Sequence, residues 1–289
     1  MSEEKNIIKA IKEKGNNLEA EMSFFDHLEA LRWHLIRSVI AVAVFSILAF
    51  CNFHFLFNTI IMAPFRPTFW SFRMMCYLGT MFHLSGFCID HINGTIINTE
   101  MAGQFLLQIN TSLLIGVILG IPYILWEIWR FIKPALLEKE RKAASGFVVY
   151  SSLLFITGIL FGYYILVPES VAFLAGYTVS DVIHNQFNIS SYLSIVSTIT
   201  LLTGILFELP IVIYILASIG ILTGTFMRKT RRYAIVIIMI VGAIVSPSPD
   251  VLTTTLATVP LLVLYEVGIL VASVVEKRRL KKHEELMAS

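Results

Sequence analysis

Residues 192–222 read YLSIVSTITLLTGILFELPIVIYILASIGIL, an apolar run in which Glu208 is the one charged residue. This run exceeds the roughly 20 residues that an α-helix needs to cross the hydrocarbon core of a bilayer. An acidic side chain at mid-membrane depth costs about 2.5–3.5 kcal/mol, so such a residue normally faces a partner, a water-filled cavity or a substrate path. Pro210, two residues further on, breaks helical hydrogen bonding. The stretch therefore predicts a membrane-spanning helix with a functional carboxylate near its middle.

The composition extends this prediction to the whole chain. Hydrophobic residues make up 56% and charged residues 15% of the 289 residues, and the mean hydropathy is +0.77. These values indicate an all-α, polytopic membrane protein. We expect six transmembrane helices, at residues 35–55, 105–126, 144–167, 192–218, 234–245 and 251–275. A Pro-Ser-Pro-Asp turn separates the last two, and the fifth is short.

Lysine and arginine residues predict the orientation. Of the 22 basic residues, only Arg66 and Arg73 fall in the loops after the first, third and fifth helices. The positive-inside rule then places both termini of this multi-pass membrane protein in the cytoplasm. If the source is a bacterium, the membrane is the bacterial inner membrane. The predicted organisation is a cytoplasmic segment 1–34 with an amphipathic helix, a transmembrane domain 35–275 and a basic tail 276–289.

The three cysteines and the missing motifs limit the chemistry. Cys76 and Cys88 share the long first outer loop, where a disulfide is one alternative, and Cys51 is expected to be a buried free thiol. The sequence has no Walker A loop, no nucleophile elbow and no Cys-pair or His-Glu-x-x-His metal motif. We therefore expect no enzyme, no cofactor, no metal and no nucleic-acid partner.

Acidic residues on the predicted cytoplasmic side are the candidate binding groups there. Residues 22–35 form either an interfacial amphipathic helix that only anchors the first crossing, or a binding segment that uses Asp26 and Glu29. In the first cytoplasmic loop, Glu138 and Glu140 stand among basic residues, although topology requires only the bases. Carboxylates in this setting favour a cationic partner, and guanidinium is the best geometric match.

Two further acids lie near the last helix. Asp250 follows the proline-rich turn, where a helix N-cap explains it without any binding role. Glu266 lies inside the last helix and is expected to pair with a polar residue of another helix. Neither residue implies catalysis.

Taken together, four motifs resemble one known family. Their order along the chain is SFFDHLEALR at 23–32, FIKPAL with EKER at 131–141, FELP at 207–210 and SPSPD at 246–250. In this order, and on these membrane faces, they resemble TatC, the multispanning receptor of the twin-arginine protein translocase. The resemblance covers about residues 22–275.

The resemblance implies a cup-shaped, six-helix protein that binds twin-arginine signal peptides of folded cargo. It also implies assembly with single-helix TatA/TatB-type proteins, self-association in the lipid bilayer, and export driven by the protonmotive force. The positions that match the family's signal-peptide site are Glu29, Arg32, Phe131, Pro134, Glu140 and Arg141. Glu208 matches the carboxylate that contacts the partner helix, and Asp250 matches the acid of the outer turn.

One position departs from the family pattern. The second of two adjacent acids before Leu-Arg is the one implicated in signal-peptide binding, and here it is Ala30, which leaves Glu29. One residue turns a helix by roughly 100°, so Glu29 points in a different direction. Either Glu29 or Asp26 takes over, or the site depends more on Glu140.

A proton-coupled secondary transporter is the alternative function. In that case Glu208 would load and release the proton. Such transporters commonly contain internal repeats with matched broken helices, and the prolines of this chain do not pair in that way.

Overall fold

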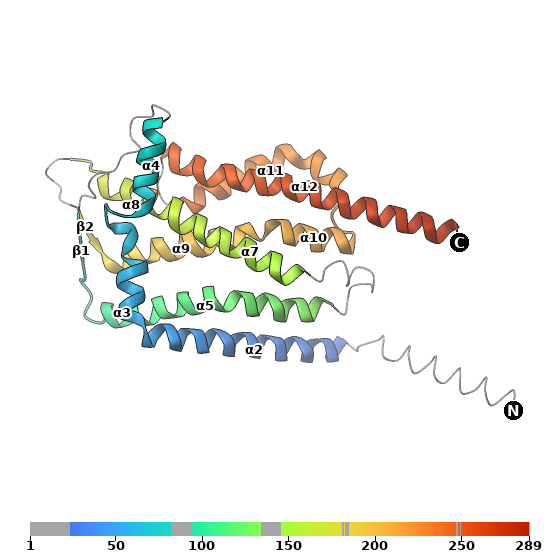
Figure 1. The fold of residues 1–289 in the computed structure, drawn as a ribbon, viewed down its shortest axis with the longest axis horizontal. Helices are drawn as coiled ribbons and strands as arrows, with labels where there is room; N and C mark the ends of the chain where they lie inside the picture. The colour runs from blue at the N-terminus through green and yellow to red at the C-terminus, as the bar shows by residue number, and fades with distance from the viewer. Residues whose placement is uncertain are drawn as a thin grey trace.

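A computed structural model describes residues 24–81, 94–133, 146–180, 182, 185–246, 248 and 250–288 (Figure 1). Two short strands and a set of long helices make up this part of the chain. The helices are α2 (Phe24–Cys51), α3 (Phe53–Leu56), α4 (Trp70–Met81), α5 (Gly103–Ile132), α7 (Phe147–Phe161), α8 (Val167–Gly176), α9 (Ile189–Phe207), α10 (Leu209–Ile219), α11 (Gly224–Val245) and α12 (Val251–Ala288). The strands are β1 (Thr95–Ile97) and β2 (Gln186–Asn188), and short π- and 3-10-helical turns cover Phe57–Ile61, Ala63–Phe65 and Gly162–Leu166.

The predicted fold class is confirmed, because the described chain is a bundle of long apolar helices. Five segments are long and apolar enough to cross a membrane: Leu28–Cys51, Gly103–Ile132, Phe147–Gly176, Ile189–Ile219 and Val251–Leu280. The remaining predicted crossing lies in α11, whose first half carries four basic residues and whose second half is the short apolar run. The first crossing begins earlier than expected, since α2 runs without interruption from Phe24 to Cys51.

The long helices run side by side and alternate in direction (Figure 1). One end of the bundle holds the beginning of α2, the end of α5, the beginning of α7, the α10–α11 connection and the end of α12. We call this the basic end, because Arg32, Arg130, Arg228 and Arg278 belong to these helix termini. The opposite end carries the strands and α4, and we call it the strand end. The alternation is the one that the basic residues predict.

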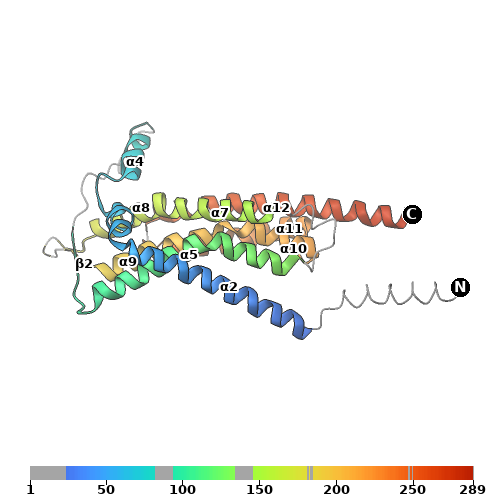
Figure 2. The same cartoon turned by 60° about the horizontal axis from the view of Figure 1, so that its bottom comes forward.

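Glycines let neighbouring helices approach closely. A Cβ on Gly158 of α7 would lie 2.7 Å from the carbonyl oxygen of Thr203 in α9, and one on Gly162 would meet the hydroxyl of the same threonine. Gly116 of α5 lies against Ser46 of α2 in the same way. Membrane helices associate through such close contacts, since lipid supplies no hydrophobic force between them. Figure 2 shows α2 at one edge of the bundle, inclined to the other helices.

The part of the first outer loop around Ile61 and Phe69 packs on the bundle. The hydroxyl of Tyr192 in α9 donates to the carbonyl oxygen of Ile61 at 2.6 Å, and Phe69 stacks on Tyr164. Cys76 is disulfide-bonded, and Cys88 lies outside the described residues. Cys51 is a free thiol as expected, but it is exposed on the bundle surface instead of buried.

The two strands connect the beginnings of α5 and α9. β1 pairs with β2 in parallel, from Thr95 opposite Gln186 to Ile97 opposite Asn188. The Asn188 side chain donates to the Thr99 hydroxyl at 2.8 Å and accepts a hydrogen bond from the backbone N–H of Ser190, so that it caps α9. Backbone and side-chain bonds thus join two helices that are far apart in sequence.

Candidate functional site

A buried carboxylate at the basic end was missed by the sequence analysis. The second crossing was expected to end at residue 126, and Glu127, which follows it, was not among the candidate residues. The helix α5 instead continues to Ile132, and the Glu127 side chain is only 1% exposed. Tyr123 and Arg130, one turn away on either side, were the local signal for a polar cluster, since residues three or four apart share a helix face.

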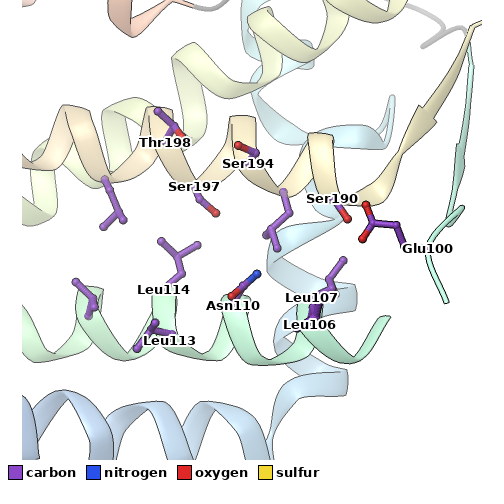
Figure 3. Close-up of a pocket in the computed structure, with 13 residues that line it drawn as sticks. Glu100, Leu106, Leu107, Asn110, Leu113, Leu114, Ser190, Ser194, Ser197 and Thr198 are labelled. Atoms are coloured by element: carbon purple, nitrogen blue, oxygen red, sulfur yellow. The ribbon is translucent and has the colours of Figure 1, made fainter. Parts of the chain in front are cut away.

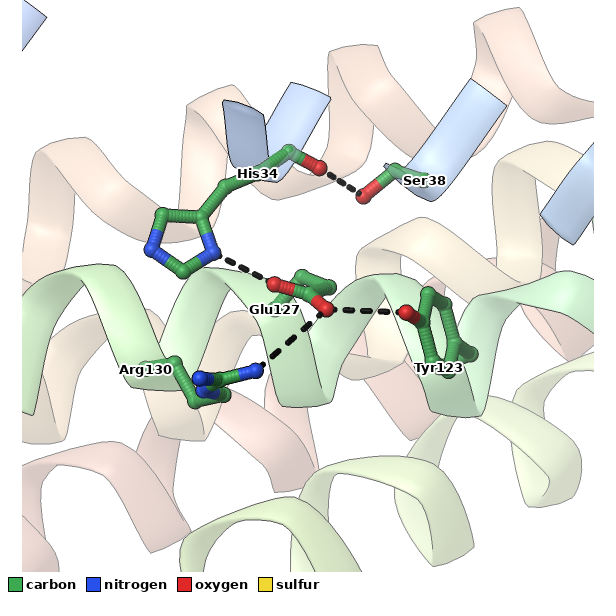
Figure 4. A network of polar contacts seen from close by, with 5 residues as sticks. All are labelled: His34, Ser38, Tyr123, Glu127 and Arg130. Carbon is green, nitrogen blue, oxygen red and sulfur yellow. Dashed lines mark hydrogen bonds and ion pairs between the residues drawn. The ribbon is translucent and has the colours of Figure 1, made fainter. Parts of the chain in front are cut away.

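Glu127 binds groups from two helices (Figure 4). Its Oε2 contacts Nδ1 of His34 in α2, and its Oε1 accepts a hydrogen bond from the Tyr123 hydroxyl at 2.9 Å. The guanidinium of Arg130 lies 3.8 Å from the same Oε1. The hydroxyl of Ser38 donates a hydrogen bond to the carbonyl oxygen of His34, which stabilises the helical turn that carries His34.

These contacts join α2 to α5 beside the predicted signal-peptide residues. A buried acid is tolerated where its oxygens are paired and hydrogen-bonded, and both oxygens of Glu127 are. The His34 ring also meets the Phe131 ring edge-on, with the centroids 6.1 Å apart. The pair therefore sets the distance between the beginning of α2 and the end of α5.

The predicted signal-peptide residues fall into two groups. Glu29 and Arg32 are exposed on α2, and Phe131 is half-buried on the last turn of α5. Pro134, Glu140 and Arg141 lie outside the described residues, as do Glu138 and the side chain of Asp26. Ala30, which occupies the family's acid position, is half-buried. The structure thus brings Arg32 and Phe131 to the same end on neighbouring helices, and it leaves the carboxylate of Glu29 accessible.

Glu208 lies at a break in the fourth crossing. It caps α9 and precedes α10, and its backbone N–H donates to Ile205 in a tightened last turn. Pro210 takes the second position of α10, where no helical N–H partner is required. The proline that the sequence places inside one helix therefore divides it into two.

The Glu208 side chain has one partner among the described residues. Its Oε2 accepts a hydrogen bond from the hydroxyl of Ser151 in α7 at 2.5 Å, and Ser151 is fully buried. The other oxygen, Oε1, is buried and has no hydrogen-bond partner in this part of the chain. Glu208 thus joins α7 to the α9–α10 break and keeps one acceptor unused.

A groove of about 510 Å³ separates α5 from α9 towards the strand end (Figure 3). Leucines of both helices form its walls, and Glu100 lies at its mouth. Polar side chains run along it, and Asn110 of α5 points towards the hydroxyl groups of α9. These hydroxyl groups belong to Ser190, Ser194, Ser197 and Thr198. Such a lining suits an apolar segment that carries a few polar groups.

Two other acids occupy defined positions. Glu266 of α12 forms an ion pair with Arg231 of α11 at 2.6 Å, as the sequence analysis expected of a residue inside the last helix. Glu169, in the first turn of α8, is buried and interacts electrostatically with Asp250. The sequence analysis had assigned Glu169 to a polar outer loop. Within the described ranges no group of three His, Cys, Asp or Glu residues could hold a metal ion.

Asp250 caps the N-terminus of α12. Its Oδ2 accepts hydrogen bonds from the backbone N–H and the hydroxyl of Thr253, at 2.7 and 2.8 Å. Burial alone would raise the pKa of Asp250, but these bonds and one from Ser248 outweigh burial and hold the pKa below its ordinary value of 3.8. The carboxylate is therefore the form that the folded protein stabilises.

The cap predicts a pH-dependent loss of stability in an Asp250→Ala variant. At pH 7 the variant should be less stable by about 1 kcal/mol, because an N-cap is lost. The pKa is lower in the folded state, so the charged carboxylate contributes fully above pH 3.8 and its contribution fades as pH falls through the folded-state value. Thermal unfolding in detergent at pH 7 and at pH 3 measures this difference. An equal gap between wild type and variant at both pH values would contradict it, and Asp250→Asn provides a neutral cap for comparison.

The chain matches the family model described as Sec-independent protein translocase protein (TatC) over residues 26–260. A Sec-independent protein translocase protein TatC of Blattabacterium is 36% identical over 265 residues, which cover 91% of this chain and 99% of the relative. The corresponding protein of Aquifex aeolicus is 32% identical, over 89% of this chain and 98% of its own.

Solved structures agree in fold. A crystal structure described as the twin arginine translocase receptor TatC superposes with a TM-score of 0.64 at 32% identity, and covers 86% of this chain and 99% of its own. A second crystal structure of such a receptor, in the detergent DDM, gives a TM-score of 0.66 with the same coverage.

Proposed function

Because the chain belongs to the TatC family of Sec-independent protein translocase proteins, we propose that it is the receptor and core subunit of a twin-arginine protein translocase. It is a multi-pass inner-membrane protein, and its family is a non-enzymatic component of protein transport. In this proposal it binds twin-arginine signal peptides of folded proteins, assembles with TatA/TatB-type single-helix proteins and with itself, and exports cargo with the protonmotive force.

The signal peptide binds at the basic end. Arginine guanidinium groups pair with carboxylates through charge-assisted, often bidentate hydrogen bonds. Glu29 and Glu140 supply the carboxylates, while Arg32, Phe131, Pro134 and Arg141 complete the surface. The observation that supports this site best is the contact of His34 with both Glu127 and Phe131, which fixes α2 against the end of α5. The loop that carries Glu140 follows α5 directly in the sequence.

Glu29 replaces the acid that the family places at position 30. Its exposed side chain is free to turn towards the signal peptide, whereas position 30 is half-buried. The replacement changes the direction of approach by about 100°, and Glu140 consequently bears more of the interaction with the arginine pair.

Glu208 receives a partner helix. Its Oε1, which has no hydrogen-bond partner among the described residues, lies at a break in the membrane-spanning segment, where the helix backbone is already interrupted. Inside a bilayer, polar contacts of this kind contribute about 0.6–2 kcal/mol to helix association. Asp250 has a structural role in the outer turn, as the cap of α12.

Site-specific cross-linking of a twin-arginine signal peptide tests the receptor site. Glu140→Ala should weaken the cross-link roughly tenfold or more, because a hydrogen bond to a charged group contributes about 1.5–3 kcal/mol. Glu29→Ala should weaken it by a smaller factor. The same peptide with both arginines changed to lysine measures the background. Unchanged cross-linking of both variants would rule out this assignment.

Glu208→Ala provides the separation-of-function control. This variant should still cross-link the signal peptide but should lose co-purification of single-helix partners from native membranes. If it loses signal-peptide binding instead, cargo recognition does not reside at the basic end.

A further inference from the structure

A second cavity, of about 330 Å³, opens between α7, α10 and α12 near the basic end. Its apolar wall is formed by Leu154 of α7, Ile211 of α10, and Val267 and Val271 of α12. The polar part of the lining consists of the side chains of Tyr150, Tyr214 and Arg278. We call this cavity the α7–α12 groove. None of these residues belongs to the proposed signal-peptide or partner-helix sites.

The groove has the length of one membrane leaflet. Val267 and Arg278 are about three helical turns apart on α12, which corresponds to about 16 Å along the helix axis. Half of the hydrocarbon core of a bilayer is about 15 Å thick. The distance from Val267 to Arg278 therefore matches the thickness of one leaflet, with the valines on the core side and Arg278 on the headgroup side. Tyr150 is exposed and lies with Tyr214 towards the same end, which is the depth that tyrosine prefers in membranes.

The charge at the end of the groove is positive. No carboxylate among the described residues lies within ion-pair distance of Arg278. The nearby Glu276 is engaged by the backbone N–H of Gly224 at 2.9 Å. The guanidinium of Arg279 lies against Gly220 at the end of α10, and the exposed Lys277 does not line the groove. Arg278 is thus the cation that faces the cavity.

Charge and cross-section favour a lipid over a helix as the occupant. A helix with its side chains is about 10–12 Å across. An extended hydrocarbon chain is much thinner, and a phosphate needs the guanidinium and hydroxyl donors that stand at the headgroup level. We propose that the α7–α12 groove binds one anionic phospholipid, with an acyl chain along the valines of α12 and its phosphate on Arg278.

Native mass spectrometry of the purified full-length protein tests the site. The protein is titrated with palmitoyl-oleoyl phosphatidylglycerol, and with phosphatidylcholine of the same chains as the zwitterionic control. Arg278→Gln should bind phosphatidylglycerol roughly fivefold more weakly, because a basic residue near the surface contributes about that factor. Lys277→Gln removes the same charge one residue away and should bind as the wild type does.

A second variant separates the groove from surface charge. Val267→Trp keeps every charge and places an indole in the apolar part of the groove, at a position that is 40% exposed in the bundle. It should lose the bound phosphatidylglycerol while retaining the melting temperature of the wild type. Equal losses for Arg278→Gln and Lys277→Gln, full binding by Val267→Trp, or a co-purified single-helix protein that excludes the lipid would each overturn the proposal. Because no signal peptide is present, the outcome is independent of the proposed receptor function.

Discussion

Replacing Glu127 by alanine is expected to destabilise the folded protein by about 3–5 kcal/mol, as for other broken buried ion pairs. The Tyr123 hydroxyl and the His34 ring both lose their acceptor, in a place where the removed side chain was 1% exposed. We expect the apparent melting temperature in detergent to fall by several degrees, and the signal-peptide cross-link to weaken because α2 is no longer fixed against α5.

Two variants control for this effect. Glu127→Gln retains the shape and one oxygen for the Tyr123 hydroxyl, so it should lose a smaller part of the stability. Glu100→Ala removes an exposed acid and should stay within about 0.5 kcal/mol of the wild type.

In a double-mutant cycle, His34→Ala and Glu127→Ala should show a coupling energy of about 0.5–3 kcal/mol. Purely additive effects, or a Glu127→Ala protein as stable as Glu100→Ala, would contradict the proposed link between the helices.

Gly158→Leu is the second substitution with a large expected effect, about 3 kcal/mol of lost stability. A Cβ at this position would lie 2.7 Å from the Thr203 carbonyl oxygen and 2.8 Å from the Phe207 Cβ, and a backbone atom cannot move aside cheaply. The helices α7 and α9 must separate, which also pulls Ser151 away from Glu208. Lower yield and a lower apparent melting temperature are the readouts.

Gly176→Leu is the matched control for this substitution. It makes the same chemical change at the end of α8, where no atom lies within 4 Å of a Cβ at that position. The control should therefore melt close to the wild type. Equal melting of the two leucine variants would show that the close contact between α7 and α9 does not limit stability.

The order and direction of the long helices could be predicted from the sequence, because two patterns recur along the whole chain. Apolar runs must match the thickness of the bilayer, and basic residues must collect at alternate helix ends. Residues 192–222 and the groups around Arg130, Arg228 and Arg278 satisfy both requirements, and the structure arranges them as expected.

The site was harder to predict because its key contact is not local. Glu127 and His34 are 93 residues apart, and the sequence around one does not indicate contact with the other. Glu127 also comes directly after Trp126, where the second crossing was expected to end, although α5 continues to Ile132. Burial that arises from helix–helix packing cannot be seen in the hydropathy of one helix.

The contacts made at helix breaks could not be predicted from the sequence either. Pro210 predicts an interruption, yet only packing reveals that Ser151 of another helix occupies one oxygen of Glu208. Glu169 falls in the outer loop expected after the third crossing, but Pro168 and Glu169 belong to the first turn of α8, a position that suits proline.

The strand pair described above also constrains how α5 and α9 can move. β1 and β2 fasten the beginnings of these helices to each other by backbone hydrogen bonds, whereas the groove between them begins directly beyond that connection. A change in the width of the groove is then a rotation about a fixed hinge, small near the strands and growing with distance along the helices. A segment that enters between the two helices would therefore separate them least beside the strands and most at their far ends.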